Sequence, residues 1–477
     1  MTLTWAQVAP AAPEIFLAAA ICAVLMIDVF FGDKRRGVTP TVTLAVLALG
    51  AWLTLQFSTV TGRIVLFDGL YIADRVAQFL KLAAFLFVAV ALCYSRPSLE
   101  RRGILRGEYY VLALTALLGI CVMVSAGSLL TIYLGVELLA LSLYAMVAFD
   151  RDSGVSAEAA MKYFVLGAIA SGMLLYGMSL VYGLGGTLSL DELAIVMSGD
   201  PSLGVVLGVV FIVAAVAFKF GAVPFHMWVP DVYQGAPTAV TLFIATAPKI
   251  ASFALAFRLL AGGLVGIAAG WTQMLAVLAV LSLIVGNLLA IAQSNLKRML
   301  AYSAIANVGF ILLAFAAGSN AGNEAALYYT IVYVIMALGS FGVILLLSHT
   351  GFEADELDHY RGLNARDPLL ALLMLMLMFS TAGIPPFVGF WAKLAVFQAL
   401  WQSGHLWLVV IGALASVVGA YYYLRVVKLM YFDPPGELPR GAPELPLRIV
   451  LGVNAFAVLL LGVMPGTLLD ICRRVLQ

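Results

Sequence analysis

The chain has 477 residues, of which 63% are hydrophobic and only 11% are charged. A soluble domain of average composition carries roughly 25% charged residues, and no water-soluble fold of this length could bury so many apolar side chains, so lipid must surround much of the molecule. The formal net charge of +1 comes without a clustered basic arm, which argues against a nucleic-acid-binding protein.

Cofactor-binding motifs are missing from the sequence. The cysteines Cys22, Cys93, Cys121 and Cys472 are scattered through apolar runs, and no pair has the spacing of a zinc or iron–sulfur site. No GxxxxGK motif occurs, and the glycines at 183–186 lack the strand context of a dinucleotide-binding fingerprint. We therefore expect no metal, redox centre or nucleotide in this chain.

Hydrophobic runs near the ~20 residues that cross a bilayer recur along the whole chain. The predicted spans are residues 11–31, 40–60, 75–95, 108–124, 127–149, 159–183, 204–222, 238–260, 270–292, 297–317, 324–349, 367–400, 405–430 and 447–469. Short loops join them. The sequence therefore predicts an all-α polytopic membrane protein with about fourteen transmembrane helices, forming a single membrane domain over residues 1–477.

Basic residues accumulate in alternate loops. The larger set comprises Lys34, Arg35, Arg36, Arg96, Arg101, Arg102, Arg106, Arg151, Lys297, Arg298, Arg361, Arg366, Arg425, Lys428, Arg440 and Arg448. The opposite loops hold only Arg63, Arg75, Arg258, Arg473 and Arg474. By the positive-inside rule the larger set faces the cytoplasm, and both termini then lie on the outer side of the membrane.

Two segments interrupt the helical pattern inside predicted spans. They are KFGAVPFH at residues 219–226 and GIPPFVG at residues 383–389. Proline removes a helix hydrogen bond, and interrupted backbone at membrane depth is tolerated only where protein or a wet cavity satisfies its polar groups. The two breaks lie five spans apart, and an odd number of spans inverts the second copy, so we predict two inverted five-helix repeats, each containing a broken helix. Paired interruptions of this kind point to a transport site. The predicted division is N-terminal helices 1–3 at 1–107, repeats at 108–260 and 270–430, and helix 14 at 447–477.

Four of the ionisable residues inside the predicted spans are the strongest candidates for a functional role. A charge at the centre of a transmembrane helix costs about 2.5–3.5 kcal/mol on insertion scales, so each one requires a reason. Glu137 lies midway along the fifth span, Lys219 just before the first break, Lys249 inside the eighth span, and Lys393 after the second break. A lysine near a span end can snorkel or form a structural ion pair, but a short glutamate in mid-span cannot reach the interface. We predict that these four residues transfer protons or other cations.

The mechanism that these residue types permit is a switch of pKa. Burial disfavours the charged form of a lysine, and a nearby carboxylate favours it again. A lysine whose carboxylate partner approaches and withdraws can therefore take up a proton on one side and release it on another. We predict that Glu137 and Lys219 form such a pair across neighbouring helices.

Two other ionisable residues in the spans, His226 and Lys162, each have two alternative roles. His226, just past the first break, could relay protons at neutral pH or donate hydrogen bonds to the broken backbone. Lys162, near the cytoplasmic end of the sixth span, could be a second partner for Glu137 or an interfacial anchor. Structural roles are expected for Lys81 and Arg425 (anchors or ion pairs) and for Asp231 (a turn or helix cap).

The stretch KFGAVPFHMWVPDVYQGAPTAVTLFIATAPK at residues 219–249 resembles the signature of the antiporter-like membrane subunits of respiratory complex I. The segments NLKRMLAYS at 295–303 and GIPPFVGFWAK at 383–393 continue the match. Within this family, Ala-Pro before Lys249 and a lysine at position 393, where M subunits carry glutamate, are similar to the N subunits of bacterial proton-translocating NADH:quinone oxidoreductase. The resemblance covers nearly the whole chain.

The resemblance implies a proton-translocating subunit that couples NADH oxidation and quinone reduction to proton transfer across the bacterial cytoplasmic (inner) membrane. It implies Glu137 and Lys219 as the coupled pair, Lys249 as the central relay and Lys393 as the terminal lysine of the second half-channel. NADH, flavin, iron–sulfur clusters and quinone would be bound by other subunits. The implied partners are the small K-type subunit and the antiporter-like M subunit. The alternatives are a subunit of a multi-subunit sodium/proton antiporter and a purely structural membrane scaffold.

One departure from the family pattern concerns the route between Lys249 and Lys393. Sister subunits often place histidine in the tenth span and lysine or histidine deep in the eleventh. Here those spans offer Ser303, Asn307, Tyr328, Tyr329, Thr330 and Tyr333. We therefore expect the route between the two lysines to depend on hydroxyl groups and water.

Overall fold

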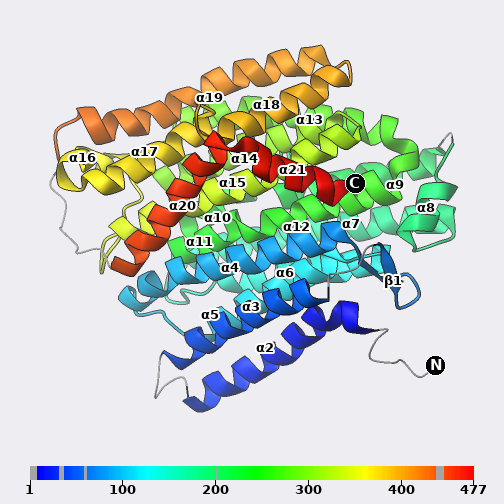
Figure 1. Cartoon of the computed structure of the whole chain (residues 1–477), viewed down its shortest axis with the longest axis horizontal. Coiled ribbons are helices and arrows are strands. Elements are labelled where there is room, and N and C mark those ends of the chain that lie inside the picture. Colours follow the sequence, from blue (N-terminus) through cyan, green and yellow to red (C-terminus); the bar gives the residue numbers. More distant parts are fainter. Residues whose placement is uncertain (1–7, 32–36, 58–61, 200, 437–444) are drawn as a thin grey trace.

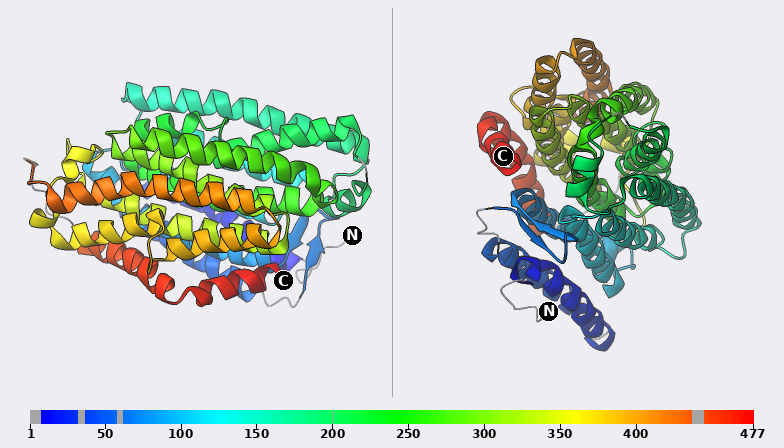
Figure 2. Two further views of the ribbon diagram at one scale, coloured as in Figure 1. Left: turned by 90° about the horizontal axis from the view of Figure 1, so that it is seen from above. Right: turned by 90° about the vertical axis from the view of Figure 1, so that its right-hand side faces the viewer.

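The computed structural model describes residues 8–31, 37–57, 62–199, 201–436 and 445–477. Over these residues it is a bundle of long helices that run nearly parallel to one another (Figures 1 and 2). Thirteen helical segments of the described chain are long and apolar enough to cross a membrane. The prediction of an all-α polytopic fold is therefore confirmed. Four basic residues used to predict the orientation, Lys34, Arg35, Arg36 and Arg440, lie outside the described residues.

The first part of the chain consists of helices and one hairpin: η1 (Ala9–Ala11), α2 (Ala12–Phe31), α3 (Val38–Gln56), β1 (Ile64–Leu66), β2 (Tyr71–Ala73), α4 (Arg75–Arg101), α5 (Gly107–Val124), α6 (Leu129–Val147) and α7 (Gly154–Gly185). The two strands are antiparallel, with Ile64 opposite Ala73 and Leu66 opposite Tyr71. This hairpin falls between two predicted spans and was not expected from the sequence.

The middle of the chain contains the first broken helix, formed by α9 and α10. Its elements are α8 (Leu190–Val196), α9 (Leu203–Phe220), α10 (Trp228–Gly235), α11 (Thr238–Ala245), α12 (Ala247–Ala256), the π-helical η2 (Phe257–Gly263), η3 (Val265–Ile267) and α13 (Ala268–Ile291). The last part of the chain contains the second broken helix, formed by α17 and α18. Its elements are α14 (Leu296–Ala316), α15 (Asn320–Leu347), η4 (Leu357–Tyr360), α16 (Leu363–Arg366), α17 (Pro368–Ala382), α18 (Val388–Gln402), α19 (Leu406–Phe432), α20 (Leu445–Val463) and α21 (Pro465–Leu476).

Both predicted helix breaks are present, and they share one geometry. Gly221 follows α9 with φ +80°, and Gly383 follows α17 with φ +88°, a left-handed conformation that glycine adopts without a Cβ clash. Each break then contains a cis X-Pro bond three residues further on, at Pro224 and Pro386. The second break divides the predicted twelfth span into two helices of 15 residues each. The boundaries of the two repeats remain a prediction.

The predicted fourteenth span is also shorter than expected. It ends at Val463, and a separate helix, α21, begins at Pro465. Proline lacks the backbone N–H that would continue α20, but it is well suited to the first position of a new helix.

Three helical segments occupy the centre of the bundle. In the most apolar stretch of each segment, all residues of α14 are buried, as are 94% of those in the segment that contains α11 and α12 and 89% of those in α15. A helix that is apolar on all sides is expected to be surrounded by other helices. The polar residues on these helices therefore lie far from lipid, and Lys249, Ser303 and Asn307 are among them.

The two ends of the bundle differ in the loops that they carry. The hairpin, α8, α21 and the start of α2 gather at one end, whereas α16 and the connection from α4 to α5 lie at the other (Figure 1). We call the latter the basic end, because it holds the described loops of the larger basic set. An even number of spans returns the chain to the side where it began, and the first and last described helices, α2 and α21, accordingly have their outer termini at the opposite end.

If the basic end faces the cytoplasm, thiol labelling of whole cells should distinguish two loops. A cysteine at Ser198, in the exposed connection between α8 and α9, should react with an impermeant reagent on a cysteine-free background. A cysteine at the exposed Thr350, at the basic end, should react only after the membrane is permeabilised. Labelling of the Thr350→Cys protein but not of the Ser198→Cys protein in intact cells would reverse the predicted topology.

Candidate proton-transfer site

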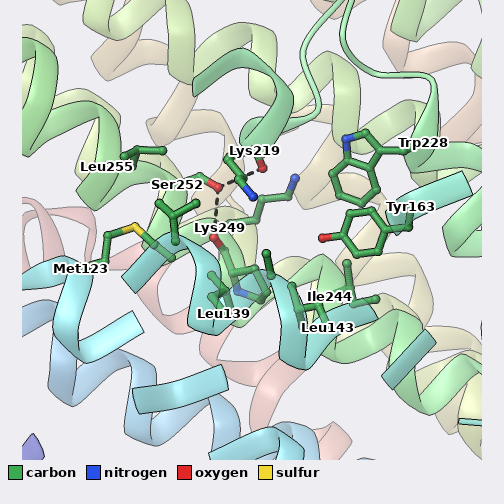
Figure 3. Close-up of a pocket in the computed structure, with 14 residues that line it drawn as sticks. Met123, Leu139, Leu143, Tyr163, Lys219, Trp228, Ile244, Lys249, Ser252 and Leu255 are labelled. Carbon is green, nitrogen blue, oxygen red and sulfur yellow. Dashed lines mark hydrogen bonds between the residues drawn. The ribbon is translucent and has the colours of Figure 1, made fainter. Parts of the chain in front are cut away.

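Lys219 and Lys249 line the same buried cavity, together with side chains of α5, α6, α7 and α10. Figure 3 shows Tyr163 and Trp228 at one end of this cavity and Met123 and Leu255 toward the other. It offers about 30 Å³ to the centres of water molecules, and one water needs roughly 10–15 Å³ on that measure. The cavity therefore has room for about two waters.

Lys249 is placed by an interruption that the sequence analysis missed. The predicted eighth span divides at Thr246, whose φ of −119° and ψ of −88° are not helical. The signal in the sequence is Pro248, which suits the first turn of a new helix. Lys249 is 2% exposed, and its Nζ donates a 2.7 Å hydrogen bond to the backbone oxygen of Phe220. Phe220 is the last residue of α9, so its carbonyl has no partner within that helix.

Lys393 is held in the same way at the second break. Its Nζ donates a 2.8 Å hydrogen bond to the backbone oxygen of Ala382, the last residue of α17. Both accepting carbonyls come directly before the left-handed glycine of their break. A helix C-terminus carries partial negative charge and favours a cation. Each broken helix thus presents a helix end that stabilises a buried ammonium group.

Gly383 also makes room for Lys393. A Cβ at this position would lie 2.9 Å from Cδ and 3.2 Å from Nζ of Lys393. The Lys393 ammonium lies 5.1 Å from the ring centroid of Phe310 on α14. Helix α14 therefore reaches the terminal lysine of the predicted path.

Glu137 and Lys219 lie close enough for their charges to interact. They come from α6 and from the last turn of α9, and although both are described, they form neither an ion pair nor a hydrogen bond with each other. One carboxylate oxygen of Glu137 is buried and has no hydrogen-bond partner. The backbone oxygen of Lys219 accepts a 3.0 Å bond from the Ser252 hydroxyl (Figure 3). The pair is thus neighbouring but open, with an unpaired acceptor on the acidic side.

Lys162 and Asp231 pair with each other and not with Glu137. The Lys162 ammonium lies 2.9 Å from Glu158 and 2.9 Å from Asp231. Asp231 also forms a 2.9 Å ion pair with Arg298 of α14. The structure therefore does not bring Lys162 to Glu137 as a second partner. Asp231 lies in the first turn of α10, as a capping residue would, but its carboxylate links three helices.

His226 lies apart from the cavity. It is half-buried in the bend between α9 and α10, next to the exposed Met227, and its Nδ1 is buried without a hydrogen-bond partner. The structure does not bring it to Lys219 or Lys249 as a lining residue of their cavity.

Lys81 and Arg425, for which structural roles were expected, have different partners. Lys81 forms a buried ion pair with Glu14 at 2.5 Å and donates to the Tyr71 hydroxyl at 2.8 Å, which confirms the ion-pair prediction. Arg425 instead donates to the backbone oxygens of Ile291 and Gln293, so it anchors the end of α13.

A chain of buried hydrogen bonds occupies the second half of the bundle. Ser303 and the Tyr423 hydroxyl lie 2.5 Å apart, and the Tyr329 hydroxyl donates to Asn307 at 2.8 Å. Asn307 also contacts Ser303 through its amide nitrogen. The chain thus joins α14, α15 and α19, and three of the predicted residues belong to it.

Three members of this chain, Tyr423, Tyr422 and Asn287, were not predicted from the sequence. The Tyr422 hydroxyl donates to Asn287 of α13 at 3.0 Å and lies 3.2 Å from the Tyr423 hydroxyl. Three consecutive tyrosines at 421–423 within a predicted span were the available signal. Of the other candidates, Tyr328 has a buried hydroxyl without a partner, and Thr330 bonds only to its own helix.

Comparison with known proteins establishes the family. A family model described as NADH:quinone oxidoreductase/Mrp antiporter, TM, matches residues 126–419. NADH-quinone oxidoreductase subunit N of Thiobacillus denitrificans is 55% identical over 475 residues, covering 99% of this chain and 98% of the relative. The protein of the same name from Nitrosomonas europaea is 49% identical, covering 98% of each chain. The chain belongs to the NADH-quinone oxidoreductase subunit N family.

Solved structures agree with membership of the subunit N family. A chain of respiratory complex I from Thermus thermophilus with bound aureothin aligns with a TM-score of 0.81 at 33% identity, covering 96% of this chain and 98% of that one. A chain of the Mrp complex from Dietzia sp. DQ12-45-1b aligns with a TM-score of 0.87 at 21% identity, covering 98% and 97%. The Mrp likeness shows a shared fold only. The resemblance to antiporter-like subunits of complex I is thus confirmed.

Proposed function

We propose that this chain is the N subunit of an NADH:quinone oxidoreductase and moves protons through its interior by way of Glu137, Lys219, Lys249 and Lys393. The observation that supports this most directly is the repeated arrangement at the two helix breaks. In each, a buried lysine donates to the last carbonyl of a broken helix, and the first of these lysines shares a cavity with Lys219. A structural scaffold would not need several buried lysines without carboxylate partners.

The proposed mechanism uses repulsion between neighbouring ammonium groups. Adding a proton to Lys219 disfavours a second proton on Lys249 across the same small cavity. Glu137 counteracts this effect by stabilising the charged form of Lys219, so movement of Glu137 relative to Lys219 decides which lysine is charged. A proton displaced from Lys249 then passes through water and the Ser303–Asn307–Tyr329–Tyr423 chain toward Lys393.

The remaining assignments follow from the same proposal. We infer that this subunit performs no redox step and holds no cofactor of its own, and that NADH, flavin, iron–sulfur clusters and quinone bind to other subunits. Its membrane partners would be the K-type and M subunits. The subunit would lie in a bacterial cytoplasmic membrane with the basic end inside and both termini on the periplasmic side.

The test is a Lys249→Met variant of the assembled complex. We expect NADH-driven proton uptake into membrane vesicles to fall by about tenfold or more, the effect of a barrier raised by about 1.4 kcal/mol. The matched control is Lys428→Met, which removes an exposed lysine that pairs with Asp433 at the surface. Wild-type pumping by assembled Lys249→Met complex would contradict the proposal. Uptake that requires sodium ions would favour the sodium/proton antiporter alternative.

A further inference from the structure

Two stacked aromatic rings close one end of the cavity that holds Lys219 and Lys249. Tyr163 of α7 and Trp228 of α10 lie with ring centroids 4.5 Å apart and planes only 18° from parallel. Both line the cavity and are nearly completely buried. In Figure 3 they lie side by side, beyond the two lysines. Helices α7 and α14 both begin at the basic end. Tyr163 lies in the first half of α7, and Arg298, in the first turn of α14, binds Asp231 of α10. The ring pair therefore closes the cavity toward the basic end.

Ion pairs hold α10 in place just beyond these rings. Asp231 is one helical turn after Trp228, and Lys162 is the residue before Tyr163. The Asp231–Lys162 pair therefore joins the same two helices as the ring stack, at 2.9 Å. Arg298 at the start of α14 binds the other carboxylate oxygen of Asp231 at 2.9 Å and the Gln234 side chain at 3.0 Å.

The far end of α10 is also fastened to α14. Lys297, which is 1% exposed, donates to the backbone oxygen of Ala236 at 3.0 Å and to Glu353 at 3.3 Å. Burial alone would raise the pKa of Glu353, but Lys297 and Arg102 outweigh it and hold the pKa below its usual value. Glu353 therefore stays ionised at neutral pH and keeps Lys297 in place.

Helix α10 has only eight residues and follows a backbone break, so these side-chain contacts add to the packing of its buried face in holding it in position. The Lys162 and Asp231 side chains are 45% and 31% exposed. Ion pairs with that much exposure are individually weak and can open. The rings, by contrast, are packed and buried, and they would exclude water from the cavity for as long as α10 stays in place.

We propose that α10 is a gate between the Lys219 cavity and the basic end of the bundle. The Tyr163–Trp228 stack is the barrier, and the Asp231 ion pairs with Lys162 and Arg298 are the latch that keeps it shut. Its relevance to pumping rests on the function proposed above. Arg298 lies on the same helix, α14, as Ser303, Asn307 and Phe310. A movement of α14 in the second half of the bundle would therefore displace Arg298 and change its ion pair with Asp231 at the gate.

The gate can be tested without measuring pumping. Ile244 lines the cavity and is 1% exposed, so a cysteine there, on a cysteine-free background of the intact complex, reports access by a small thiol reagent. We expect Asp231→Asn to speed its modification by roughly three- to tenfold, because opening then breaks fewer charge-assisted hydrogen bonds. Trp228→Ala should speed modification of the cysteine at least as much. Asp231→Glu keeps the carboxylate, so its cysteine should be modified as slowly as in the protein with Asp231.

The matched control is Asp191→Asn, which removes an exposed ion pair with Arg63 far from α10. It should leave the modification rate unchanged. If Asp231→Asn impairs assembly, Lys162→Met removes one ion pair of the latch from the exposed side and serves instead. Unchanged modification in the latch variants and in Trp228→Ala would overturn the gate. Faster modification with pumping intact would support the gate and count against the cavity as the proton path, which separates this proposal from the proposed function.

Discussion

Neutralising Glu137 or Lys219 is expected to remove most proton pumping while the complex still assembles. In Glu137→Gln the side chain keeps its size but no longer favours the charged form of Lys219. In Lys219→Met the partner cannot take up a proton at all. Either change leaves one member of the pair unable to respond to the other, so we expect a loss of about tenfold or more, equivalent to roughly 1.4 kcal/mol in the barrier.

The measurement is proton uptake in membrane vesicles alongside quinone-linked NADH oxidation. Since electron transfer and pumping are coupled, oxidation should fall as well, though by a smaller factor. The control is Glu192→Gln, which changes an exposed carboxylate on α8 that accepts a hydrogen bond from Thr187. Full pumping by well-assembled Glu137→Gln protein would rule out the coupled pair.

Replacing Lys393 by either methionine or arginine should impair proton pumping, for opposite reasons. Methionine cannot carry a proton to the exit side. Arginine stays protonated in proteins, so it could replace the charge next to the Ala382 carbonyl but could not release a proton. We expect both variants to pump at least about tenfold more slowly than the wild type, the effect of roughly 1.4 kcal/mol in the barrier. Glutamate, the residue of M subunits at this position, should substitute in part.

The comparison is informative only if both variants assemble, because space around this side chain is limited. Gly383 approaches the lysine so closely that even a Cβ would lie 3.2 Å from its Nζ. Assembly should therefore be checked by isolating the intact complex before proton uptake is measured. If Lys393→Arg pumps like the wild type and Lys393→Met does not, Lys393 acts as a fixed positive charge and the release role is wrong.

The sequence by itself determined the class of protein, the approximate positions of most spans, the two breaks at Gly221 and Gly383 and the identity of the buried charges. Each of these depends on contiguous residues. About twenty consecutive apolar residues are long enough to cross a bilayer. Gly221 and Pro224 interrupt a helix wherever it lies, and Glu137 in mid-span is costly in any arrangement of its neighbours. The same local character allowed the motif at 219–249 to indicate the family.

Only the tertiary structure decided which of these residues meet. Lys162 faces Asp231 and not Glu137, Lys249 reaches the end of α9, and Tyr422 and Tyr423 join a hydrogen-bonded chain with residues more than a hundred positions away. Such partners depend on how each helix is rotated, tilted and shifted along its axis. Those variables are set by packing against neighbouring helices, and a nearly all-apolar helix carries little amphipathic signal to show which of its faces meets which neighbour.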